Sequence, residues 1–324
     1  MSPLRVGLLG PGGIGARHIK ALAQLPEEGE LVACCGRDAE RTQAFTTEHG
    51  GAVYTDFDAM LTREALDLLI VALPPFAHTG QVEAAARKGV HLLVEKPIAL
   101  DMVRADTMVE AADAAGIVAA CAFMYRFGEA VERWETADTG RPGMFTGFFH
   151  CNSLHSPWWR ERALSGGQTV EQLIHIVDLA RHTLGMPETV YAKAANLFHR
   201  DVPRYDTEDV SAMILGYEDG RIGLLNASNA AAPGRWEKGW KIISERMTGS
   251  FTDFNAGELT RSASEGGSET VMSERDVFVA QLADVVGAIR DGRKAKVPLS
   301  EGADSLRIAL AARRSAEEGR EVVV

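Results

Sequence analysis

Two patterns in the sequence predict an α/β protein: an N-terminal doubly wound parallel sheet, followed by a C-terminal α+β domain with an open, mainly antiparallel sheet. In the first part, short apolar runs alternate with helical patterns, and repeated βα units of this length build a parallel sheet with helices on both faces. In the second part, alternating strand-like runs are separated by turn signals. The 324 residues, 46% of them hydrophobic, suffice for two cores, and we place the domains at residues 1–124 and 125–324.

The first domain is predicted from a regular succession of apolar strands and amphipathic helices. Its strands are continuous apolar runs, typical of a sheet buried on both faces. Ligands of such sheets bind beyond the carboxyl ends of the strands. The predicted strands are 4–9, 31–35, 53–54, 66–72, 91–94 and 117–122, and the predicted helices are 14–25, 39–49, 57–61, 78–88 and 101–115.

The pattern changes near residue 125, where longer strand-like runs follow one another. Their links carry Gly, Pro, Asp and Asn, such as the turn signal at 218–220. The last helices are candidates for packing back on the first domain. The predicted strands are 144–151, 189–197, 210–216, 221–227, 241–244 and 249–254, and the predicted helices are 127–137, 168–184, 274–290 and 303–318.

A glycine-rich turn, GPGGIG at residues 10–15, directly follows the first strand and opens the first helix. Gly10 permits a tight turn, Gly12 leaves the backbone open to a pyrophosphate, and Gly15 lets the helix pack close to the sheet. The phosphates would lie on the free N–H groups at the helix start, next to Gly13 and Ile14. The turn therefore predicts a dinucleotide site, and the alternative is a glycine-rich turn without a ligand.

Composition narrows the possible partners and the compartment. The net charge of −11 argues against nucleic acid or an anionic membrane surface as the main partner. No apolar stretch is long enough to span a bilayer, and no signal peptide precedes the first strand, so we expect a cytoplasmic protein. The four cysteines show no metal-ligand spacing and are expected to be reduced packing residues.

Glu95-Lys96-Pro97 follows the predicted strand 91–94 directly. Lys96 should therefore emerge at the carboxyl end of a strand, beside the expected dinucleotide. A partly desolvated lysine near an oxidised nicotinamide has a lowered pKa, which suits proton transfer. The alternative is a surface lysine at a turn.

A second candidate lies in the predicted helix 168–184, which two glycines precede. Glu171 and His175 are four residues apart and share one helix face, and Asp178 follows three residues later. A histidine with a carboxylate one turn away is a plausible acid/base pair. It is equally compatible with a structural histidine or half of a metal site, but no third ligand favours a metal, and we predict none.

The order of these motifs resembles the glucose–fructose oxidoreductase/inositol dehydrogenase family (Gfo/Idh/MocA). The resemblance rests on GPGGIG, on Pro74-Pro75-x-x-His78, on Glu95-Lys96-Pro97, on the helix segment with Glu171, His175 and Asp178, and on RRSAEEGR at 313–320, and it covers nearly the whole chain. It implies an N-terminal Rossmann domain that binds NAD or NADP. It also implies a C-terminal domain that supplies substrate contacts and an oligomer interface.

By this resemblance, Lys96 and His175 act at the reacting carbon, with Glu171 where the family commonly has an aspartate. The extra methylene of Glu171 leaves open whether Lys96 or His175 transfers the proton. The loop with Pro74, Pro75 and His78 is expected to line the cofactor together with Glu95, although His78 would also fit a helix start without a ligand.

The end of the second predicted strand carries the signal for the cofactor. NAD enzymes usually have an acidic residue there for the ribose hydroxyls, whereas this sequence reads Gly36-Arg37-Asp38. An arginine pairs with the 2′-phosphate of NADP. NADP is therefore favoured, while Asp38 keeps NAD possible and Arg37 has the alternative of a solvated turn residue.

Further residues are candidate substrate contacts. An arginine near the domain junction has a structural or substrate role in the family, and adjacent tryptophans on a loop can stack on a sugar ring or anchor the loop in a core. These candidates are Tyr125, Arg126, His155, Trp158, Trp159, Arg160 and Asp178.

The leading prediction is an NAD(P)-dependent dehydrogenase or reductase acting on a secondary alcohol or ketone of a small sugar, polyol or cyclitol. The alternatives are a redox-neutral NAD-dependent glycosidase, a non-catalytic dinucleotide sensor, and a reductase of a non-sugar ring such as a dihydrodiol or tetrapyrrole. The resemblance implies a homo-oligomer, a dimer or a tetramer, and the second face of the antiparallel sheet is where another subunit could meet it.

Overall fold

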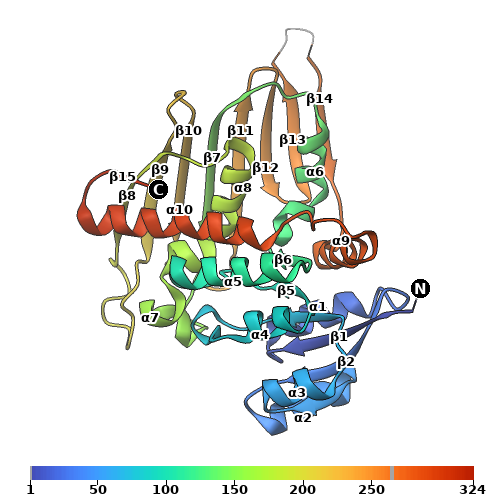
Figure 1. Cartoon of the computed structure of the whole chain (residues 1–324). Helices are drawn as coiled ribbons and strands as arrows, with labels where there is room; N and C mark the ends of the chain where they lie inside the picture. Colours follow the sequence, from blue (N-terminus) through green and yellow to red (C-terminus); the bar gives the residue numbers. More distant parts are fainter. Residues whose placement is uncertain (1, 263–265) are drawn as a thin grey trace. The chain divides into compact units, whose positions relative to one another are not determined.

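The computed structural model describes residues 2–262 and 266–324 (Figure 1). The chain divides into two compact units. The first comprises residues 1–124 and 276–303, and the second comprises residues 125–275 and 304–324.

The first unit contains a six-stranded parallel sheet with the strand order β3-β2-β1-β4-β5-β6. This order reverses direction at β1 and β4, which creates the switch point where doubly wound sheets bind ligands. The strands are β1 (Leu4–Leu9), β2 (Gly29–Cys35), β3 (Ala52–Tyr54), β4 (Leu68–Val71), β5 (His91–Val94) and β6 (Ala119–Cys121). The helices are α1 (Gly13–Leu22), α2 (Ala39–His49), α3 (Phe57–Arg63), α4 (Gln81–Arg87), α5 (Met102–Ala115) and α9 (Val277–Asp291), and a 3-10 turn spans Pro75–Ala77.

The strands of this sheet are buried because helices cover them. All residues of β4 are inaccessible to solvent, as expected for a parallel strand between two helical layers. Helix α9 packs against α1, and Ala120 of the last strand bridges to Pro298. Residues 276–303 group with the first unit. The sequence analysis counted them in the second domain, with the last helices as candidates for packing back on the first.

One predicted helix begins later than expected. The sequence pattern predicted a helix over residues 78–88, but α4 begins at Gln81. Gly80, with φ 138°, precedes it, and its positive φ separates the helix from the 3-10 turn. His78 therefore lies in the connection before the helix.

The second unit contains a nine-stranded sheet with the order β14-β13-β12-β11-β7-β10-β9-β8-β15. Its strands pair antiparallel except for β7 and β10, which are parallel, so the sheet is mixed. The strands are β7 (Pro142–His150), β8 (Thr189–Ala195), β9 (Val210–Gly216), β10 (Ile222–Ser228), β11 (Glu237–Ser244), β12 (Met247–Asp253), β13 (Ala256–Arg261), β14 (Ser268–Met272) and β15 (Val322–Val323).

Helices cover one face of this sheet. Figure 1 shows α10 running across strands β8 to β10, α8 beside β7, and α6 near β13 and β14. Helix α10 also contains the boundary between the units, at residue 303. The helices are α6 (Glu129–Thr136), α7 (Arg162–Ser165), α8 (Ile174–Leu184) and α10 (Leu299–Glu318), with 3-10 turns at Met124–Phe127 and Pro157–Arg160 and a π-helix at Thr169–Leu173.

Two features of the second unit differ from the sequence prediction. The continuous helix predicted over 168–184 begins with the π-helix and becomes α-helical at Ile174. The hairpin of β13 and β14 and the short β15 were not predicted, because β14 has almost no buried residue and β15 has two residues in all. Among the described residues, none of the helices is both long enough and apolar enough to cross a bilayer.

Candidate functional site

The glycine turn after β1 has the geometry that a dinucleotide requires. Gly10 has φ 103°, and a Cβ on it would lie 2.5 Å from the carbonyl oxygen of Ala72. A Cβ on Gly15 would lie 2.4 Å from the carbonyl oxygen of Gly10, so only glycine permits this close approach of α1. At Gly12 and Gly13 a Cβ would meet nothing within 4 Å. The backbone at the start of α1 is thus open on the side where a pyrophosphate would bind.

The sheet order brings three predicted segments to the same edge. Strands β1, β4 and β5 are neighbours and parallel, so their carboxyl ends lie together. The glycine turn follows β1, Pro74 and Pro75 follow β4, and Glu95 and Lys96 follow β5. Within the first unit, the predicted dinucleotide-binding segments therefore form one continuous edge, and the half-buried Lys96 belongs to it.

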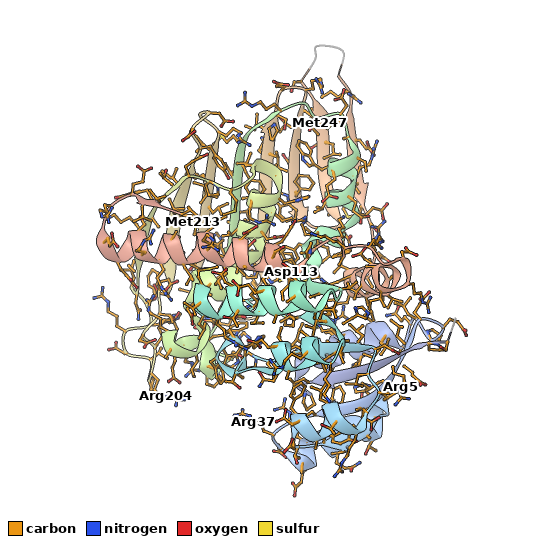
Figure 2. The ribbon with its side chains drawn as sticks, viewed as in Figure 1. Arg5, Arg37, Asp113, Arg204, Met213 and Met247 are labelled. Atoms are coloured by element: carbon orange, nitrogen blue, oxygen red, sulfur yellow. The ribbon has the colours of Figure 1, made fainter. Side chains whose placement is uncertain are left out.

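The turn after β2 has no room for a side chain at position 36. A Cβ on Gly36 would lie 2.5 Å from Thr42 Oγ1 and 2.6 Å from Pro11 Cγ, so this position has no space for an acidic side chain. Asp38 caps α2, and its Oδ1 accepts the Arg41 backbone N–H at 3.0 Å. Arg37 is exposed, and Figure 2 shows it on the outer side of the first unit, next to α2.

His78 is buried in the loop between β4 and α4. Its Nε2 lies 3.3 Å from the carbonyl oxygen of Leu73 and donates to it, which requires the neutral tautomer protonated at Nε2. Burial lowers the pKa of His78 to about 4. The imidazole is thus neutral and holds the loop that carries Pro74 and Pro75.

A buried histidine that the sequence analysis did not single out contacts Glu95. His18 of α1 is inaccessible to solvent, and its Nε2 lies 2.7 Å from Glu95 Oε1. The other carboxylate oxygen of Glu95 accepts the backbone N–H of Lys96 at 3.2 Å. The sequence signal was available, because His18 occupies the buried face of α1 together with Gly15, Ile19 and Leu22.

In the second unit, His175 lies in an aromatic environment. It is 6% exposed and stacks on Tyr125, with ring centroids 4.6 Å apart and an interplanar angle of 20°. The ring of Phe149 lies nearly parallel to His175 at 6.4 Å. Burial raises the pKa of Tyr125 well above its ordinary value, so its hydroxyl remains neutral. Lys238 Nζ lies 5.5 Å from the centroid of the Tyr125 ring.

Glu171 is buried within the π-helix that precedes α8. A π-turn changes the side-chain spacing on a helix face and often marks a functional segment. The segment enters from Gly167, which has φ 97°, and a Cβ there would lie 2.7 Å from Glu208 Oε2. The positive φ of Gly167 and this close approach both require a glycine at this position.

Two of the candidate substrate contacts take part in a buried ion-pair network. Arg126 is 2% exposed, and its Nη1 lies 3.5 Å from both carboxylate oxygens of Asp178. Asp178 also accepts from Arg181 Nη2 at 3.4 Å and from Ser305 Oγ at 3.2 Å. These contacts give Arg126 and Asp178 a structural role, one of the two roles considered for Arg126.

Hydrogen bonds within the segment 152–160 connect the polar side chains of the tryptophan loop to its own backbone. His155 Nδ1 lies 2.9 Å from the carbonyl oxygen of Asn152, and Arg160 donates to the carbonyl oxygen of Leu154. The two tryptophans of the loop meet edge to face at 5.9 Å, and Trp159 meets Trp236 at 5.8 Å. Trp236, which is 48% exposed and which the sequence analysis missed, also contacts His155 and Phe149. The loop thus adds an aromatic cluster, made of Trp158, Trp159, Trp236, His155 and Phe149.

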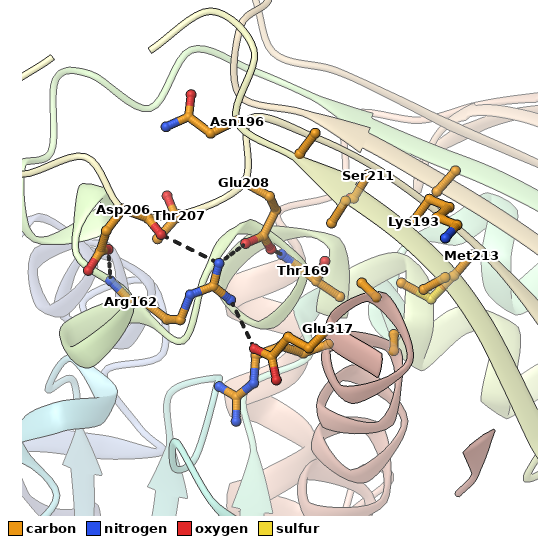
Figure 3. A pocket seen from close by; sticks show the side chains of 17 residues that line it. Arg162, Thr169, Lys193, Asn196, Asp206, Thr207, Glu208, Ser211, Met213 and Glu317 are labelled. Carbon is orange, nitrogen blue, oxygen red and sulfur yellow. Dashed lines mark hydrogen bonds and ion pairs between the residues drawn. The ribbon is translucent and has the colours of Figure 1, made fainter. Parts of the chain in front are cut away.

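The second unit contains a hollow of about 190 Å³ (Figure 3). Residues of the paired strands β8 and β9, of the segment 206–208 and of α10 line it. In it, Arg162 donates to Glu208 at 3.3 Å and lies 3.8 Å from Glu317. None of the predicted catalytic residues lines this hollow. Thr169, at the start of the π-helix, does line it, whereas Glu171 and His175 do not.

Comparison with known families agrees with this geometry. Residues 4–123 match the model of the oxidoreductase family with an NAD-binding Rossmann fold, and residues 127–248 match the GFO/IDH/MocA C-terminal domain. Among curated relatives, the chain is 28% identical to D-xylose 1-dehydrogenase (NADP(+)) 2 of Haloferax volcanii over 68% of each chain. It is 23% identical to myo-inositol 2-dehydrogenase of Thermotoga maritima over 98% of each chain. It is 30% identical to D-apiose dehydrogenase of Paraburkholderia graminis over 70% of this chain and 61% of that protein.

Solved structures show the same fold. A levoglucosan dehydrogenase in complex with NADH and L-sorbose superposes with a TM-score of 0.92 at 20% identity, over 100% of this chain and 99% of that one. The WlbA dehydrogenase of Bordetella pertussis, in complex with NADH and UDP-GlcNAcA, gives 0.85 at 26% identity over 99% of both chains. With both family models matched over most of its length, the chain belongs to the Gfo/Idh/MocA family and is an oxidoreductase with an NAD-binding Rossmann domain.

Proposed function

We propose that the protein is an NAD(P)-dependent dehydrogenase or reductase that interconverts a secondary alcohol and a ketone on a small sugar, polyol or cyclitol. The observation that carries the proposal is the placement of Lys96 on the sheet edge that also carries the open glycine turn. The xylose, inositol and apiose dehydrogenases among the relatives support the substrate class.

The residues of the first unit fit a nicotinamide dinucleotide. The open backbone at Gly12 and Gly13 and the N-terminal N–H groups of α1 would hold the pyrophosphate. When bound, the dinucleotide supplies the hydride acceptor or donor. In the oxidative direction, the amine of Lys96 takes the proton of the substrate hydroxyl, and the carbon that bears this hydroxyl loses its hydrogen as hydride. In reverse, the ammonium of Lys96 protonates the alkoxide oxygen.

His175 is the second candidate for the proton-transfer group. Stacking on Tyr125 fixes the plane of its imidazole, and Glu171 lies one helical turn before it. In this proposal Glu171 orients His175 and stabilises its charged form. Lys96 and His175 thus remain two candidates for one role, and separate substitutions distinguish them.

For the cofactor, the proposal favours NADP over NAD. Gly36 leaves no space for the carboxylate that would repel a 2′-phosphate, and the exposed Arg37 is available to pair with one. The Haloferax relative is named as an NADP(+) enzyme, whereas the levoglucosan dehydrogenase was solved with NADH.

We also propose that the protein is a homo-oligomer through the uncovered face of its nine-stranded sheet. Ile214 and Leu224 are 44% and 43% exposed and stand opposite each other on β9 and β10. Tyr191 faces Ile214 from β8, and Ile222 and Ile243 extend the apolar area across β10 and β11. A second copy would present the same apolar face, as a two-fold interface requires.

Substitution of the lysine tests the proposal directly. Lys96→Ala should abolish turnover, while dinucleotide binding measured by fluorescence titration stays within about threefold. Lys88→Ala, an exposed lysine just after α4, is the matched control and should keep full activity. Substantial turnover by Lys96→Ala would eliminate Lys96 and leave His175, for which His175→Ala is the equivalent test.

A second candidate is a reaction without net redox change on a sugar. One relative, 27% identical over 71% of this chain and 63% of its own length, is named 2,7-anhydro-N-acetylneuraminate hydratase and comes from Mediterraneibacter gnavus. Such a reaction would form product without any accumulation of reduced nicotinamide. Product analysis beside the absorbance assay separates the two.

A further inference from the structure

A direct connection links the glycine-turn helix α1 to the segment that carries Lys96. His18 lies on α1, one turn beyond Gly15, and Glu95 is the first residue after β5. In the sheet, β4 lies between β1 and β5. The 2.7 Å contact between His18 Nε2 and Glu95 Oε1 therefore connects the helix after β1 to the carboxyl end of β5.

One hydrogen bond joins the pair. His18 Nε2 lies 2.7 Å from Glu95 Oε1, and because a carboxylate oxygen accepts, the imidazole N–H is the donor. Glu95 Oε2 accepts the backbone N–H of Lys96. Glu95 is only 5% exposed, and a buried carboxylate is stable only where such donors compensate for lost hydration. Both oxygens of Glu95 are thus engaged by the protein, one by α1 and one by the Lys96 backbone.

The imidazole of His18 is held on its other side by helix α9. Phe278 meets it edge to face, with centroids 5.2 Å apart at 73°, and Arg17 lies 4.8 Å above the same phenyl ring. With no solvent access and an aromatic neighbour, His18 has a fixed orientation. Its hydrogen bond therefore has a defined direction toward Glu95.

We propose that His18 and Glu95 form a positioning pair that sets the Lys96 segment in register with the dinucleotide-binding helix. This inference rests on the proposed function, because positioning Lys96 affects turnover only if Lys96 acts at the reacting carbon. Neither residue touches the substrate. Glu95, counted among the cofactor contacts in the sequence analysis, acts in this account through Lys96.

The test compares two substitutions of one residue. His18→Ala removes the donor to Glu95, whereas His18→Gln places an amide N–H at a similar reach. A shift of about 1 Å in a reacting group can lower kcat about 100-fold, and we expect a loss of that order in His18→Ala. His18→Gln should recover most of it. The Kd for dinucleotide should change less than about threefold in both variants, because the glycine turn is unaltered.

A matched control separates positioning from loss of stability. Met60 of α3 is fully buried in the same unit and does not belong to the Lys96 edge, so Met60→Ala removes packing alone. Assays are run at a temperature where circular dichroism shows every variant folded. In the dinucleotide-free protein, the rate at which acetic anhydride labels Lys96, read by peptide mass spectrometry, should change severalfold in His18→Ala and stay unchanged in Met60→Ala.

The outcomes distinguish this inference from the proposed function. If Lys96→Ala remains fully active, the assignment of Lys96 fails whatever His18 does. If Lys96→Ala is inactive but His18→Ala keeps wild-type kcat and wild-type labelling of Lys96, the positioning pair alone is refuted. Equal losses in His18→Gln and His18→Ala would also refute it, because the donor would then have no specific role.

Discussion

The proposed preference for NADP predicts how the Kd for NADPH should change when Arg37 is replaced. The side chain is exposed after β2, and in the described part of the chain no hydrogen bond or ion pair engages its guanidinium. Arg37→Ala should therefore leave the stability of the protein unchanged. If Arg37 pairs with the 2′-phosphate as proposed, the substitution should weaken the binding of the phosphorylated cofactor alone.

The size of that effect follows from the contact. A hydrogen bond to a charged group contributes about 1.5–3 kcal/mol. Since 1.4 kcal/mol corresponds to a factor of ten, the Kd for NADPH should rise about 10- to 150-fold in Arg37→Ala. NADH lacks the 2′-phosphate, so its Kd should change less than about twofold. The contact is solvent-exposed, and added salt should reduce the difference between the two cofactors.

The assay is a fluorescence titration of NADPH and NADH against wild type, Arg37→Ala and a matched control. Arg87→Ala removes another exposed arginine, from the end of α4, and controls for the loss of one positive charge. A uniform weakening of both cofactors would show that Arg37 acts through general charge. An unchanged NADPH affinity would refute the assignment.

Three further predictions concern the ion-pair network, the sheet face and a buried histidine. Asp178→Asn removes the buried carboxylate that lies between Arg126 and Arg181 and should cost about 3–5 kcal/mol in urea unfolding. A loss below about 1 kcal/mol would contradict the structural role. Leu224→Glu places charge on the uncovered sheet face and should yield monomers in light scattering; a wild-type mass would argue against that interface. The pKa of His78 is about 4 in the folded protein and has its ordinary value of 6.5 in the unfolded chain. As the pH falls, the unfolded chain therefore binds the proton first. The free energy of unfolding should fall by up to about 3 kcal/mol between pH 6.5 and pH 4. His78→Gln should flatten that slope, and an unchanged slope would contradict it.

The first domain was predictable because its elements are strongly patterned. Continuous apolar strands such as Leu4–Leu9, and the glycine turn that follows, indicate the fold within a few adjacent residues. The mixed sheet was harder to predict, because the polar, exposed strand Ser268–Met272 has no period that distinguishes it from a loop. The parallel pairing of β7 with β10 depends on contacts between residues about 80 positions apart, which no local pattern contains.

At the site, sequence reasoning found residue types but not their partners. Asp178 lies three residues after His175 and suggested a shared chemical role, yet its carboxylate pairs with Arg126, 52 positions away. Conversely, His18 looked like one more residue of an amphipathic helix, and only the fold brings it to Glu95, 77 positions later. Trp236 likewise reaches the tryptophan loop only through the tertiary structure. Spacing along the chain predicts which residues share a helix face, whereas side-chain contacts between different elements can be predicted only when the topology is known.

The central claim, hydride transfer with a small polyhydroxylated substrate, is tested most directly by one measurement. Purified protein is incubated with NADP⁺ or NAD⁺ and a panel of sugars, polyols and inositols, or with the reduced cofactors and the corresponding ketones, and nicotinamide absorbance is followed. We predict a change at 340 nm with one substrate class, faster with the phosphorylated cofactor and absent in Lys96→Ala. Tight dinucleotide binding without any change in absorbance across the panel would contradict the account and favour a sensor or a redox-neutral enzyme.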